Sequence, residues 1–375
     1  MAEVLDWQEG VDPRSVVQQA ADALRCGKLV AFPTETVYGI AAHALDAEAV
    51  ERLGYVKGRP EDRPLTLALA NGPQANDWAP GMSALGRRLV RRCWPGPVTL
   101  VFGNGVTAGL RGRLPEGVRR RLCPEGRLGL RVPDHAAIRN AMQLLSGPLV
   151  LTSANRSGEP PAVRAEQVWE AVGQGVDLII DGGPSRYGQP STVVQVDGST
   201  WKVLRQGVVS PEELERQSAC LVLFVCTGNT CRSPLAEALC KKLLAERLGC
   251  APEELPRRGF IVQSAGLAAM IGSRATTEAV AAASQLGLDL TAHVSQPLTA
   301  EQVDKADYVV AMTSAHLAAL ASRYGACARS LRLLCTEGQD IPDPIGADAQ
   351  TYRECASRIQ DLLGKLLTEL IDPVE

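Results

Sequence analysis

The stretch that most constrains how this chain can fold is residues 221–235, which read LVLFVCTGNTCRSPL. Its first five residues are apolar and partly β-branched, which is typical of a buried strand in a parallel sheet. A short polar loop follows. Pro234 then stands where a helix should begin, because proline at the first helical position loses only an N–H without an intrahelical partner. We expect Ser233 to be the N-cap. This order predicts an anion site made of backbone N–H groups and the helix dipole.

The residues of the loop indicate covalent chemistry on a phosphoryl group. Cys226 opens the loop and Arg232 follows six residues later. A helix N-terminus and a guanidinium lower a thiol pKa, and the resulting thiolate is the nucleophilic form. The planar fork of Arg232 suits two phosphoryl oxygens. Gly228 and Asn229 tolerate the left-handed backbone of a tight loop. The alternative, a structural cysteine at a strand end, is disfavoured by the strand and helix on either side.

Residues 225–239, VCTGNTCRSPLAEAL, resemble the phosphate loop of the low-molecular-weight protein tyrosine phosphatase family, and within it the protein arginine phosphatases in particular. The resemblance implies that Cys226 attacks phosphorus and that Arg232 binds the phosphoryl oxygens. It also implies that Ser233 donates a hydrogen bond to the thiolate and that Asn229 braces the loop. Cys231 is expected to form a reversible disulfide with Cys226, which would protect the nucleophile from irreversible oxidation.

The reaction also needs a general acid for the leaving group. The candidate is Asp343, which lies between two prolines in the sequence IPDPIG, where the family places its acid. Asp340 is the weaker candidate. Without the loop upstream, a simple Asp-Pro turn would be the preferred interpretation of this segment.

The expected substrate is a phosphorylated arginine side chain. Members that act on tyrosine usually carry an aliphatic residue at the position of Thr230 and aromatic residues after the Asp-Pro. This chain has a polar Thr230 and Ile345-Gly346 instead, which favours a polar, planar guanidinium over a phenyl ring. A tyrosine phosphatase and an arsenate reductase, which use a similar thiolate loop, are the competing interpretations. Thr230 as a β-branched loop filler is the alternative for that residue.

Polar groups also follow buried strands in the first half of the chain. The turn at residues 33–39, PTETVYG, comes after an apolar strand, where α/β proteins place ligand contacts. Lys57 and Arg59 stand at the predicted end of a helix that Asp46 caps, and on residue type alone they form a solvated helix end. Arg131 is embedded in an apolar strand and therefore needs an anionic partner.

Residues 103–127 are rich in Gly and Arg, and we expect them to form a long surface loop. Within this segment the run Arg119–Arg121 could contact a polyanion, although a solvated run of charge is the commoner outcome.

Seven blocks over about residues 10–215 together resemble the YrdC-like threonylcarbamoyl-AMP synthases. In chain order they are FPTETVYG, KGRPEDRPL, WPGPVTLVF, LGLRVPDH, TSANRSGEPP, IDGGPSRYGQPSTVV and VLRQG. The family condenses ATP, L-threonine and bicarbonate into threonylcarbamoyl-adenylate and releases pyrophosphate, and the product feeds threonylcarbamoyladenosine formation in tRNA. tRNA and its modifying proteins are therefore expected partners.

The resemblance also implies the residues of this site. Those expected to hold threonine are Thr34 and Arg131, with Ser191 nearby. Those expected to bind ATP are Lys57, Arg59, Ser153, Asn155 and Arg205. Mg²⁺ is expected on the phosphates of ATP, whereas the phosphatase half needs no cofactor. One departure is Ala68, where some members carry His. The resemblance therefore does not assign the residues of that part of the threonine pocket. A non-catalytic RNA-binding module is the competing interpretation of this half.

The 375-residue chain is expected to be a cytoplasmic α/β protein with two domains. Residues 10–216 should form a YrdC-like twisted mixed sheet with helices, and residues 219–372 a Rossmann-like parallel sheet with helices on both faces. The net charge of −3 gives no basic field for nucleic acid, and no apolar run or signal segment indicates a membrane. The 11 cysteines, without C-x-x-C spacing, indicate reduced thiols and no metal site.

Overall fold

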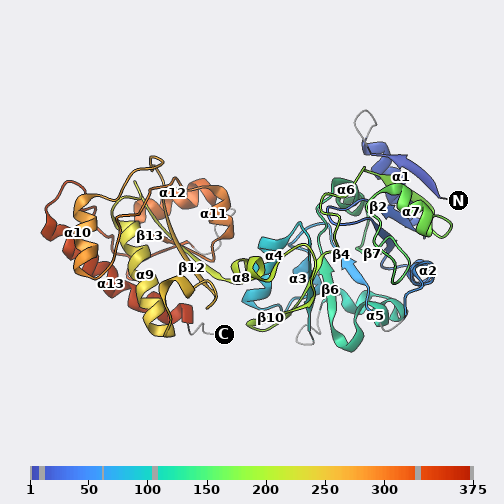
Figure 1. Cartoon of the computed structure of the whole chain (residues 1–375), viewed down its shortest axis with the longest axis horizontal. Coiled ribbons are helices and arrows are strands. Elements are labelled where there is room, and N and C mark those ends of the chain that lie inside the picture. Colours follow the sequence, from blue (N-terminus) through green and yellow to red (C-terminus); the bar gives the residue numbers. More distant parts are fainter. Residues whose placement is uncertain (1, 8–12, 61–62, 104–108, 326–330, 372–375) are drawn as a thin grey trace. The chain divides into compact units, whose positions relative to one another are not determined.

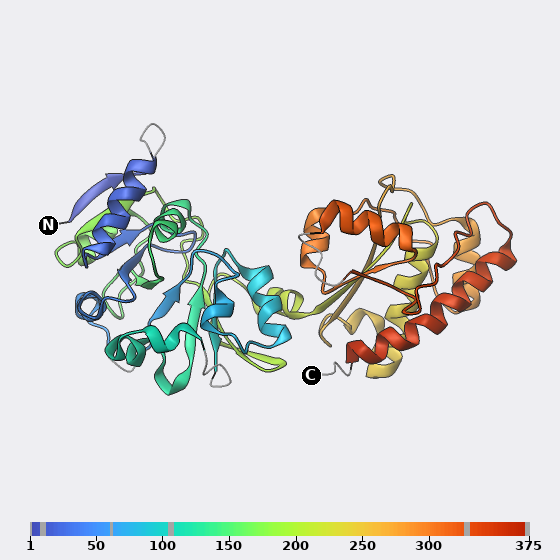
Figure 2. The same cartoon turned by 180° about the vertical axis from the view of Figure 1, so that it is seen from behind.

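The computed structural model describes residues 2–7, 13–60, 63–103, 109–325 and 331–371. The chain divides into two compact units, the first ending at Gln217 and the second beginning at Ser218. Figures 1 and 2 show both from opposite sides. Glu61 and Asp62 of the KGRPEDRPL block lie outside the described residues, as do the expected domain limits at 10 and 372. No helix in the described ranges is long and apolar enough to span a membrane.

The first unit contains ten strands among its described residues. They are β1 (Glu3–Asp6), β2 (Val30–Phe32), β3 (Gly39–His43), β4 (Thr66–Ala68), β5 (Val98–Phe102), β6 (Leu128–Arg131), β7 (Leu149–Ser153), β8 (Leu178–Asp181), β9 (Thr192–Asp197) and β10 (Thr200–Arg205). Its α-helices are α1 (Pro13–Arg25), α2 (Ala47–Lys57), α3 (Ala75–Trp78), α4 (Ala84–Cys93), α5 (Glu116–Leu122), α6 (Ala136–Leu144), α7 (Ala165–Val172) and α8 (Pro211–Ser218). Two short 3₁₀ turns are η1 (Leu110–Arg113) and η2 (Pro124–Gly126).

These strands form one mixed sheet in the order β1-β8-β2-β3-β7-β4-β6-β5-β9-β10, which confirms the expected mixed α/β sheet. Successive residues of β2 point to opposite sides, as strand geometry requires. Val30 and Phe32 join the core beside α1 and α6, whereas Ala31 joins the larger core that α2 and α4 cover. Both faces of this part of the sheet are therefore buried, and the polar residues at the strand ends are held on a rigid frame.

Two features of the first unit differ from the sequence-based expectation. Strand β3 was not expected, because its residues GIAAH are small and carry a weak strand signal. It pairs antiparallel with β2, with Phe32 opposite Gly39, so residues 33–38 connect a hairpin. The prediction of a long surface loop over residues 103–127 is wrong for its described part, where Val118 and Leu122 of α5 are buried. Residues 104–108 lie outside the described residues.

The second unit has a parallel four-stranded sheet. Its strands are β11 (Cys220–Cys226), β12 (Phe260–Gly266), β13 (Tyr308–Ala311) and β14 (Leu331–Leu333). Its helices are α9 (Arg232–Leu248), α10 (Thr277–Gln285), α11 (Ala300–Lys305), α12 (Ser314–Tyr324) and α13 (Ala349–Ile371), with a 3₁₀ turn η3 (Pro252–Glu254). The strand order is β12-β11-β13-β14, and each neighbouring pair is parallel.

Helices cover both faces of this second sheet, as expected. Val222 and Phe224 of β11 pack in the core with α9, α10 and α13, whereas Leu223 and Val225 pack with α11 and α12. All seven residues of β11 are buried. The loop after β11 therefore lies at the carboxyl end of a central strand, which is the usual place for a site in such sheets.

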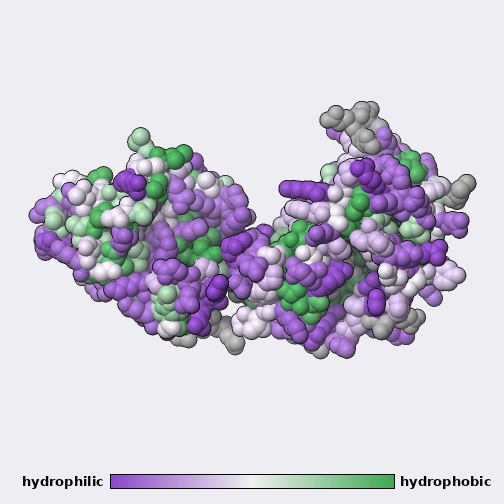
Figure 3. Space-filling view, viewed as in Figure 1, coloured by the Kyte–Doolittle hydropathy of each residue, from purple (hydrophilic) through white to green (hydrophobic). Residues whose placement is uncertain are grey.

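The start of α9 corrects one prediction. The helix begins at Arg232, with Cys231 at the N-cap position, so Ser233 is inside the first turn and is not the cap. Its hydroxyl is free for other partners for this reason. On the face visible in Figure 3, hydrophilic residues cover most of each unit and hydrophobic residues are scattered among them.

Candidate active sites

The thiol of Cys226 lies at the carboxyl end of β11, buried at the bottom of the phosphate loop. The backbone N–H of Asn229 donates to Sγ at 3.3 Å, and the hydroxyl oxygen of Ser233 lies 3.0 Å from the same sulfur. The loop and the first turn of α9 thus bring two hydrogen-bonding groups to this sulfur.

Asn229 holds the loop in this shape. It adopts a left-handed backbone with φ of 55°, as the sequence indicated. Its side-chain amide donates to the hydroxyls of Ser233 and Ser264, each at 2.9 Å, and its Oδ1 accepts from the N–H of Gln296 at 3.0 Å. The ring Nε2 of His293 lies 2.8 Å from its carbonyl oxygen. The side chain is fully buried, so every polar group is paired within the protein.

Arg232 and Asp343 lie together although 111 positions separate them in the sequence. Nη2 of Arg232 donates to Oδ2 of Asp343, and Nη1 donates to the carbonyl oxygen of Ile341 at 3.0 Å. Nε of Arg232 is buried and has no hydrogen-bond partner among the described residues. Asp340, the weaker acid candidate, accepts instead from the N–H of Ser314 at 2.7 Å. Among the described residues it makes no hydrogen bond to Arg232.

The remaining loop residues lie beside the nucleophile. The hydroxyl of Thr230 lies 3.6 Å from Sγ of Cys231. Cys231 is buried, and its sulfur lies 3.4 Å from the hydroxyl of Tyr352 and 3.5 Å from that of Thr276. Both Cys226 and Cys231 are free thiols, so the reversible disulfide stays a prediction.

Sequence reasoning missed His316 of α12. Its Nε2 lies 2.9 Å from the hydroxyl of Thr227, the residue after the nucleophile, and its Nδ1 lies 2.9 Å from Thr313. Burial, followed by the positive charge of Arg232, lowers the pKa of His316. A neutral imidazole therefore contacts the loop at Thr227, directly after the nucleophile. No local sequence signal links position 316 to position 227, because the contact depends on the order of the strands.

In the first unit, Arg131 contacts polar side chains of the turn after β2. Its Nη2 donates to Oε1 of Glu35 at 2.7 Å and to the hydroxyl of Thr36 at 2.8 Å. Thr34 lies in the same network, since its hydroxyl is 2.9 Å from that of Thr36. Nη1 of Arg131 has no partner among the described residues and can meet a carboxylate. Ala68 is opposite Arg131 in the neighbouring strand.

The anionic partner that the sequence demanded for Arg131 is therefore Glu35, which the prediction did not include. The two side chains are 9% and 3% exposed, so the ion pair is buried. Glu35 is held in turn by the N–H of Asp134, which donates to Oε2 at 2.9 Å. The sequence signal for this partner was the polar run Thr34–Thr36 after β2, called the TET turn below.

Ser191 and Arg205 lie together at the start of β9 and the end of β10. Nη2 of Arg205 donates to the carbonyl oxygen of Ser191 at 2.8 Å and to its hydroxyl at 3.2 Å. The same hydroxyl is 3.0 Å from that of Thr99 on β5. Burial, followed by the positive charge of Arg131, lowers the pKa of Arg205.

Lys57, Ser153 and Asn155 form a third group. Nζ of Lys57 donates to the hydroxyl of Ser153 at 3.0 Å and to Oδ1 of Asn155 at 2.7 Å, and it also contacts the carbonyl oxygen of Asn155. Lys57 is only 2% exposed, so the expectation of a solvated helix end is wrong for this residue. Burial, followed by repulsion from Arg59, lowers its pKa to about 7.

Arg59 follows the left-handed Gly58 that ends α2. Its guanidinium donates to the carbonyl oxygens of Arg63 at 3.2 Å and Pro64 at 2.7 Å. Burial and three arginines, Arg63, Arg205 and Arg121, lower its pKa. The predicted ATP residue Arg205 thus contacts the predicted threonine residue Ser191, in a site rich in positive charge.

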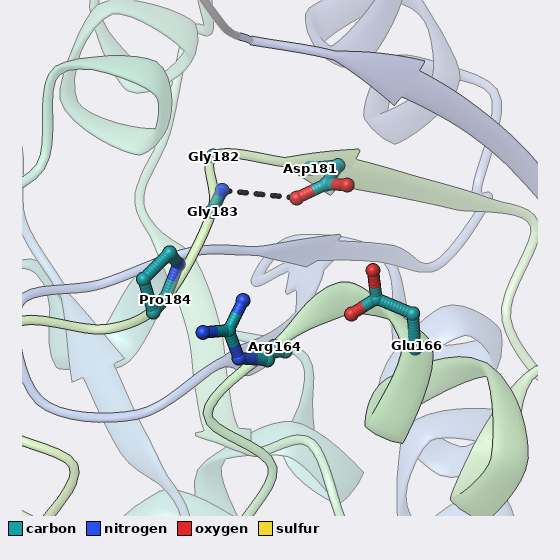
Figure 4. Close-up of a pocket in the computed structure, with 6 residues that line it drawn as sticks. All are labelled: Arg164, Glu166, Asp181, Gly182, Gly183 and Pro184. Carbon is teal, nitrogen blue, oxygen red and sulfur yellow. Dashed lines mark hydrogen bonds between the residues drawn. The ribbon is translucent and has the colours of Figure 1, made fainter.

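A separate hollow of about 400 Å³ lies at the carboxyl end of β8 and contains none of the predicted site residues. Figure 4 shows its lining, in which Arg164 and Glu166 face the segment Asp181–Pro184. It adjoins the TET turn through Tyr38, whose hydroxyl donates to the carbonyl oxygen of Gly183 at 2.7 Å. No described group of three or more His, Cys, Asp or Glu residues is arranged to hold a metal ion.

Comparison with protein families gives two matches. Residues 22–207 match the Sua5/YciO/YrdC family model, described as telomere recombination. Residues 221–374 match the model of low molecular weight phosphotyrosine protein phosphatases. These two matches confirm the resemblance of the first unit to YrdC-like proteins and that of the second unit to low-molecular-weight protein tyrosine phosphatases.

Curated relatives match the first unit. The threonylcarbamoyl-AMP synthase of Pyrococcus abyssi is 37% identical over 200 residues, which are 53% of this chain and 56% of that protein. The threonylcarbamoyl-AMP synthase of Chromohalobacter salexigens is 37% identical over 180 residues, which are 47% of this chain and 90% of that protein. The chain thus spans little more than half of the first relative and most of the second.

Solved structures match both units. P. abyssi Sua5 complexed with L-threonine aligns at 27% identity over 70% of this chain and 92% of that chain, with a TM-score of 0.51. A YwlE mutant from Bacillus subtilis aligns at 36% identity over 41% of this chain and 100% of that chain, with a TM-score of 0.37.

Proposed function

Because the chain belongs to the Sua5/YciO/YrdC family through its first unit and to the low molecular weight phosphotyrosine protein phosphatase family through its second, we propose that it is a bifunctional enzyme. The first unit would make threonylcarbamoyl-adenylate from ATP, L-threonine and bicarbonate, for the modification of tRNA. The second would remove phosphoryl groups from proteins, with phosphoarginine as the substrate.

The buried group around Arg131 supports the first activity. Glu35 and Thr36 hold the guanidinium in place, and its remaining Nη1 donor suits one oxygen of the threonine carboxylate. The amine of threonine reacts with bicarbonate to give a carbamate, and water leaves. A carbamate oxygen then attacks the α-phosphorus of ATP as pyrophosphate leaves. Mg²⁺, when bound with ATP, would neutralise phosphate charge.

The protein's own contribution to this step is positioning and positive charge. Lys57, Arg59 and Arg205 would contact the phosphates, and Ser153 and Asn155 would orient Lys57. The test is pyrophosphate release from ATP by the purified full-length chain, with and without threonine and bicarbonate. Release that depends on both substrates supports the synthase. Binding of RNA without such release would instead favour the RNA-binding module.

The contacts at Cys226 support the second activity. The Asn229 N–H and the Ser233 hydroxyl converge on the sulfur, so a thiolate can attack phosphorus and form a cysteinyl phosphate. Arg232 would bind the phosphoryl oxygens, and its partner Asp343 would protonate the leaving group. Water then attacks the cysteinyl phosphate, with Asp343 accepting a proton and phosphate leaving.

Phosphoarginine is the favoured substrate because of the residues at the loop rim. Thr230 offers a hydroxyl four residues after the nucleophile. Ile345, beyond the acid, is 65% exposed and aliphatic, so this position presents no aromatic ring to stack on phenyl groups. The test is turnover of phosphoarginine, phosphotyrosine and phosphoserine peptides side by side. A preference for phosphotyrosine would favour a tyrosine phosphatase, and thiol-dependent reduction of arsenate would favour an arsenate reductase.

A further inference from the structure

The arginine run at residues 119–121 is used by neither proposed activity, and the structure separates its side chains. The run lies in the last turn of α5. The side chain of Arg120 is 76% exposed and pairs with Glu116 at 3.5 Å. Arg121 instead has two buried guanidinium nitrogens, Nε and Nη2. Its carbonyl oxygen accepts from the N–H of Leu65 at 3.0 Å, which fixes the backbone. The run is thus not uniformly solvated.

Neither buried nitrogen of Arg121 has a hydrogen-bond partner among the described residues. An unsatisfied buried donor is destabilising, and more so when it is charged. Arg232 in the phosphate loop of the second unit also has a buried Nε without a partner. A guanidinium that the fold keeps buried and unpaired indicates that its partner is an anionic ligand.

The position of Arg121 shows which ligand it can reach. A Cβ atom built on Gly54 of α2 would lie 2.2 Å from Nη2 of Arg121, so the guanidinium lies directly over this glycine. Lys57 is three residues further along the same face of α2. The N–H of Arg59 also reaches back to the carbonyl oxygen of Gly54, at 3.1 Å. The guanidinium therefore lies within about one helical turn of both proposed phosphate-binding residues.

Strand β4 gives these groups an order. The carbonyl oxygen of Arg121 accepts from the N–H of Leu65, directly before β4, whereas Arg131 is opposite Ala68, the last residue of β4. Arg59 lies at the first of these ends, since its guanidinium donates to the carbonyl oxygen of the residue before Leu65. Arg131 is thus at the threonine end of β4, and Arg121 is at the other end with Arg59.

We propose that Arg121 binds the pyrophosphate part of ATP and of the leaving group. The inference rests on the proposed synthase activity. When the carbamate oxygen bonds to the α-phosphorus, the bond from that phosphorus to the bridging oxygen breaks, and pyrophosphate leaves with the electron pair. The attacking and leaving oxygens are roughly in line in such transfers, so pyrophosphate lies on the side away from threonine. That side is the end of β4 where Arg121 and Arg59 lie.

The test measures the binding of inorganic pyrophosphate and of AMP to the full-length chain by calorimetry. Arg121→Met should weaken pyrophosphate binding about tenfold or more, because a charge-assisted hydrogen bond is worth about 1.5–3 kcal/mol. AMP binding should not change, since AMP lacks the two terminal phosphates. The Michaelis constant for ATP should rise in parallel, and the constant for threonine should not. Arg121→Lys should recover part of the affinity, because it keeps the charge without the fork.

Two further variants make the test independent of a loss of folding. Arg120→Met removes an equal charge from the same helix and should leave pyrophosphate affinity unchanged. Gly54→Ala should displace the Arg121 guanidinium, which supplies the three nearest atoms to the new Cβ, while alanine favours the helix. It should therefore weaken pyrophosphate binding without lowering the melting temperature.

Unchanged pyrophosphate affinity in both Arg121→Met and Gly54→Ala would overturn the inference. An equal loss of pyrophosphate and AMP affinity would also overturn it, because Arg121 would then only support α2. A wild-type chain that binds pyrophosphate through Arg121 but releases none from ATP with threonine and bicarbonate would instead contradict the proposed synthase activity.

Discussion

Arg232 donates a hydrogen bond to Asp343, so the proposed phosphate-binding cation and the proposed general acid contact each other directly. Arg232 is buried and Asp343 is partly exposed, with side-chain exposures of 4% and 41%. The buried arginine is fixed by Ile341, whereas the carboxylate at the rim can approach a leaving group. A phosphoryl group that binds Arg232 would compete with Asp343 for the same nitrogen.

The first prediction tests Asp343 as the acid. Asp343→Asn should lower turnover of phosphoarginine strongly and turnover of p-nitrophenyl phosphate less, because nitrophenolate leaves without a proton. The losses expected from removing a general acid are about 10²–10⁴-fold. The measurement is kcat for both substrates. Asp340→Asn is the matched control and should have little effect. Equal losses for both substrates would show that Asp343 only positions Arg232.

The second prediction concerns the nucleophile. Cys226→Ser should abolish phosphatase turnover, because a hydroxyl with a far higher pKa replaces the thiolate. Adenylate formation should continue, since its residues lie in the first unit. Both activities are measured on the same preparation. Appreciable residual phosphatase activity would rule out the covalent mechanism.

Sequence reasoning was most successful where a local signal determines the structure. The phosphate loop follows from a buried strand, residues that permit a left-handed backbone and a helix start, and Asn229 has the expected positive φ. Asp46 caps α2 through the N–H of Ala49 at 3.0 Å, and Gly58 ends that helix in the left-handed conformation. These features depend on few neighbouring residues.

The failures came from contacts between distant segments. Glu35 meets Arg131 across 96 positions, and His316 meets Thr227 across 89. The misplaced cap at Ser233 has a local cause instead, because its hydroxyl lies near Cys226 and Asn229 of the same loop rather than a backbone N–H. Propensity gave the correct residue type for a cap, and the hydrogen bonds within the loop determined its use.

The third prediction concerns the ATP site. Lys57→Ala or Arg59→Ala should weaken ATP binding and synthase turnover by about tenfold or more, because each removes a phosphate contact worth about 1.5–3 kcal/mol. Dephosphorylation should be unaffected in both variants. The measurement is the dissociation constant for ATP beside both turnover numbers. Unchanged ATP affinity would show that neither residue binds ATP. Arg59 would then be part of a solvated helix end, and Lys57 would have a structural role.

The fourth prediction is a proton uptake when ATP binds near pH 8. The pKa of Lys57 is lowered from 10.5 to about 7, so the free folded chain has largely lost this proton at pH 8. Phosphate oxygens raise the pKa again, and the complex therefore gains the proton. In the absence of ATP, the unfolded state binds more protons than the folded state between about pH 7 and 10.5. The contribution of Lys57 to stability therefore rises with pH across this window.

Calorimetry in two buffers of different ionisation enthalpy measures this uptake. The apparent binding enthalpy should differ between the buffers for the wild type at pH 8 and should differ less at pH 6, where Lys57 is already charged. Lys57→Met should lose the buffer dependence if it still binds ATP. A wild type without any buffer dependence would show that Lys57 remains charged when the site is free.

The last prediction concerns Thr230, which lies in the loop with its hydroxyl 3.6 Å from Sγ of Cys231. A hydroxyl here can bond a guanidinium that is attached to phosphorus, whereas a phenyl ring gives it no partner. Sites built around a polar contact reject the analogue that lacks it more strongly than apolar pockets discriminate by size. Thr230→Ile should therefore lower kcat/KM for phosphoarginine and raise it for aryl phosphates. Thr230→Ser keeps the hydroxyl and should retain the preference for phosphoarginine. If the wild type already prefers phosphotyrosine, or the ratio is the same in Thr230→Ile, Thr230 only fills the loop and the arginine assignment fails.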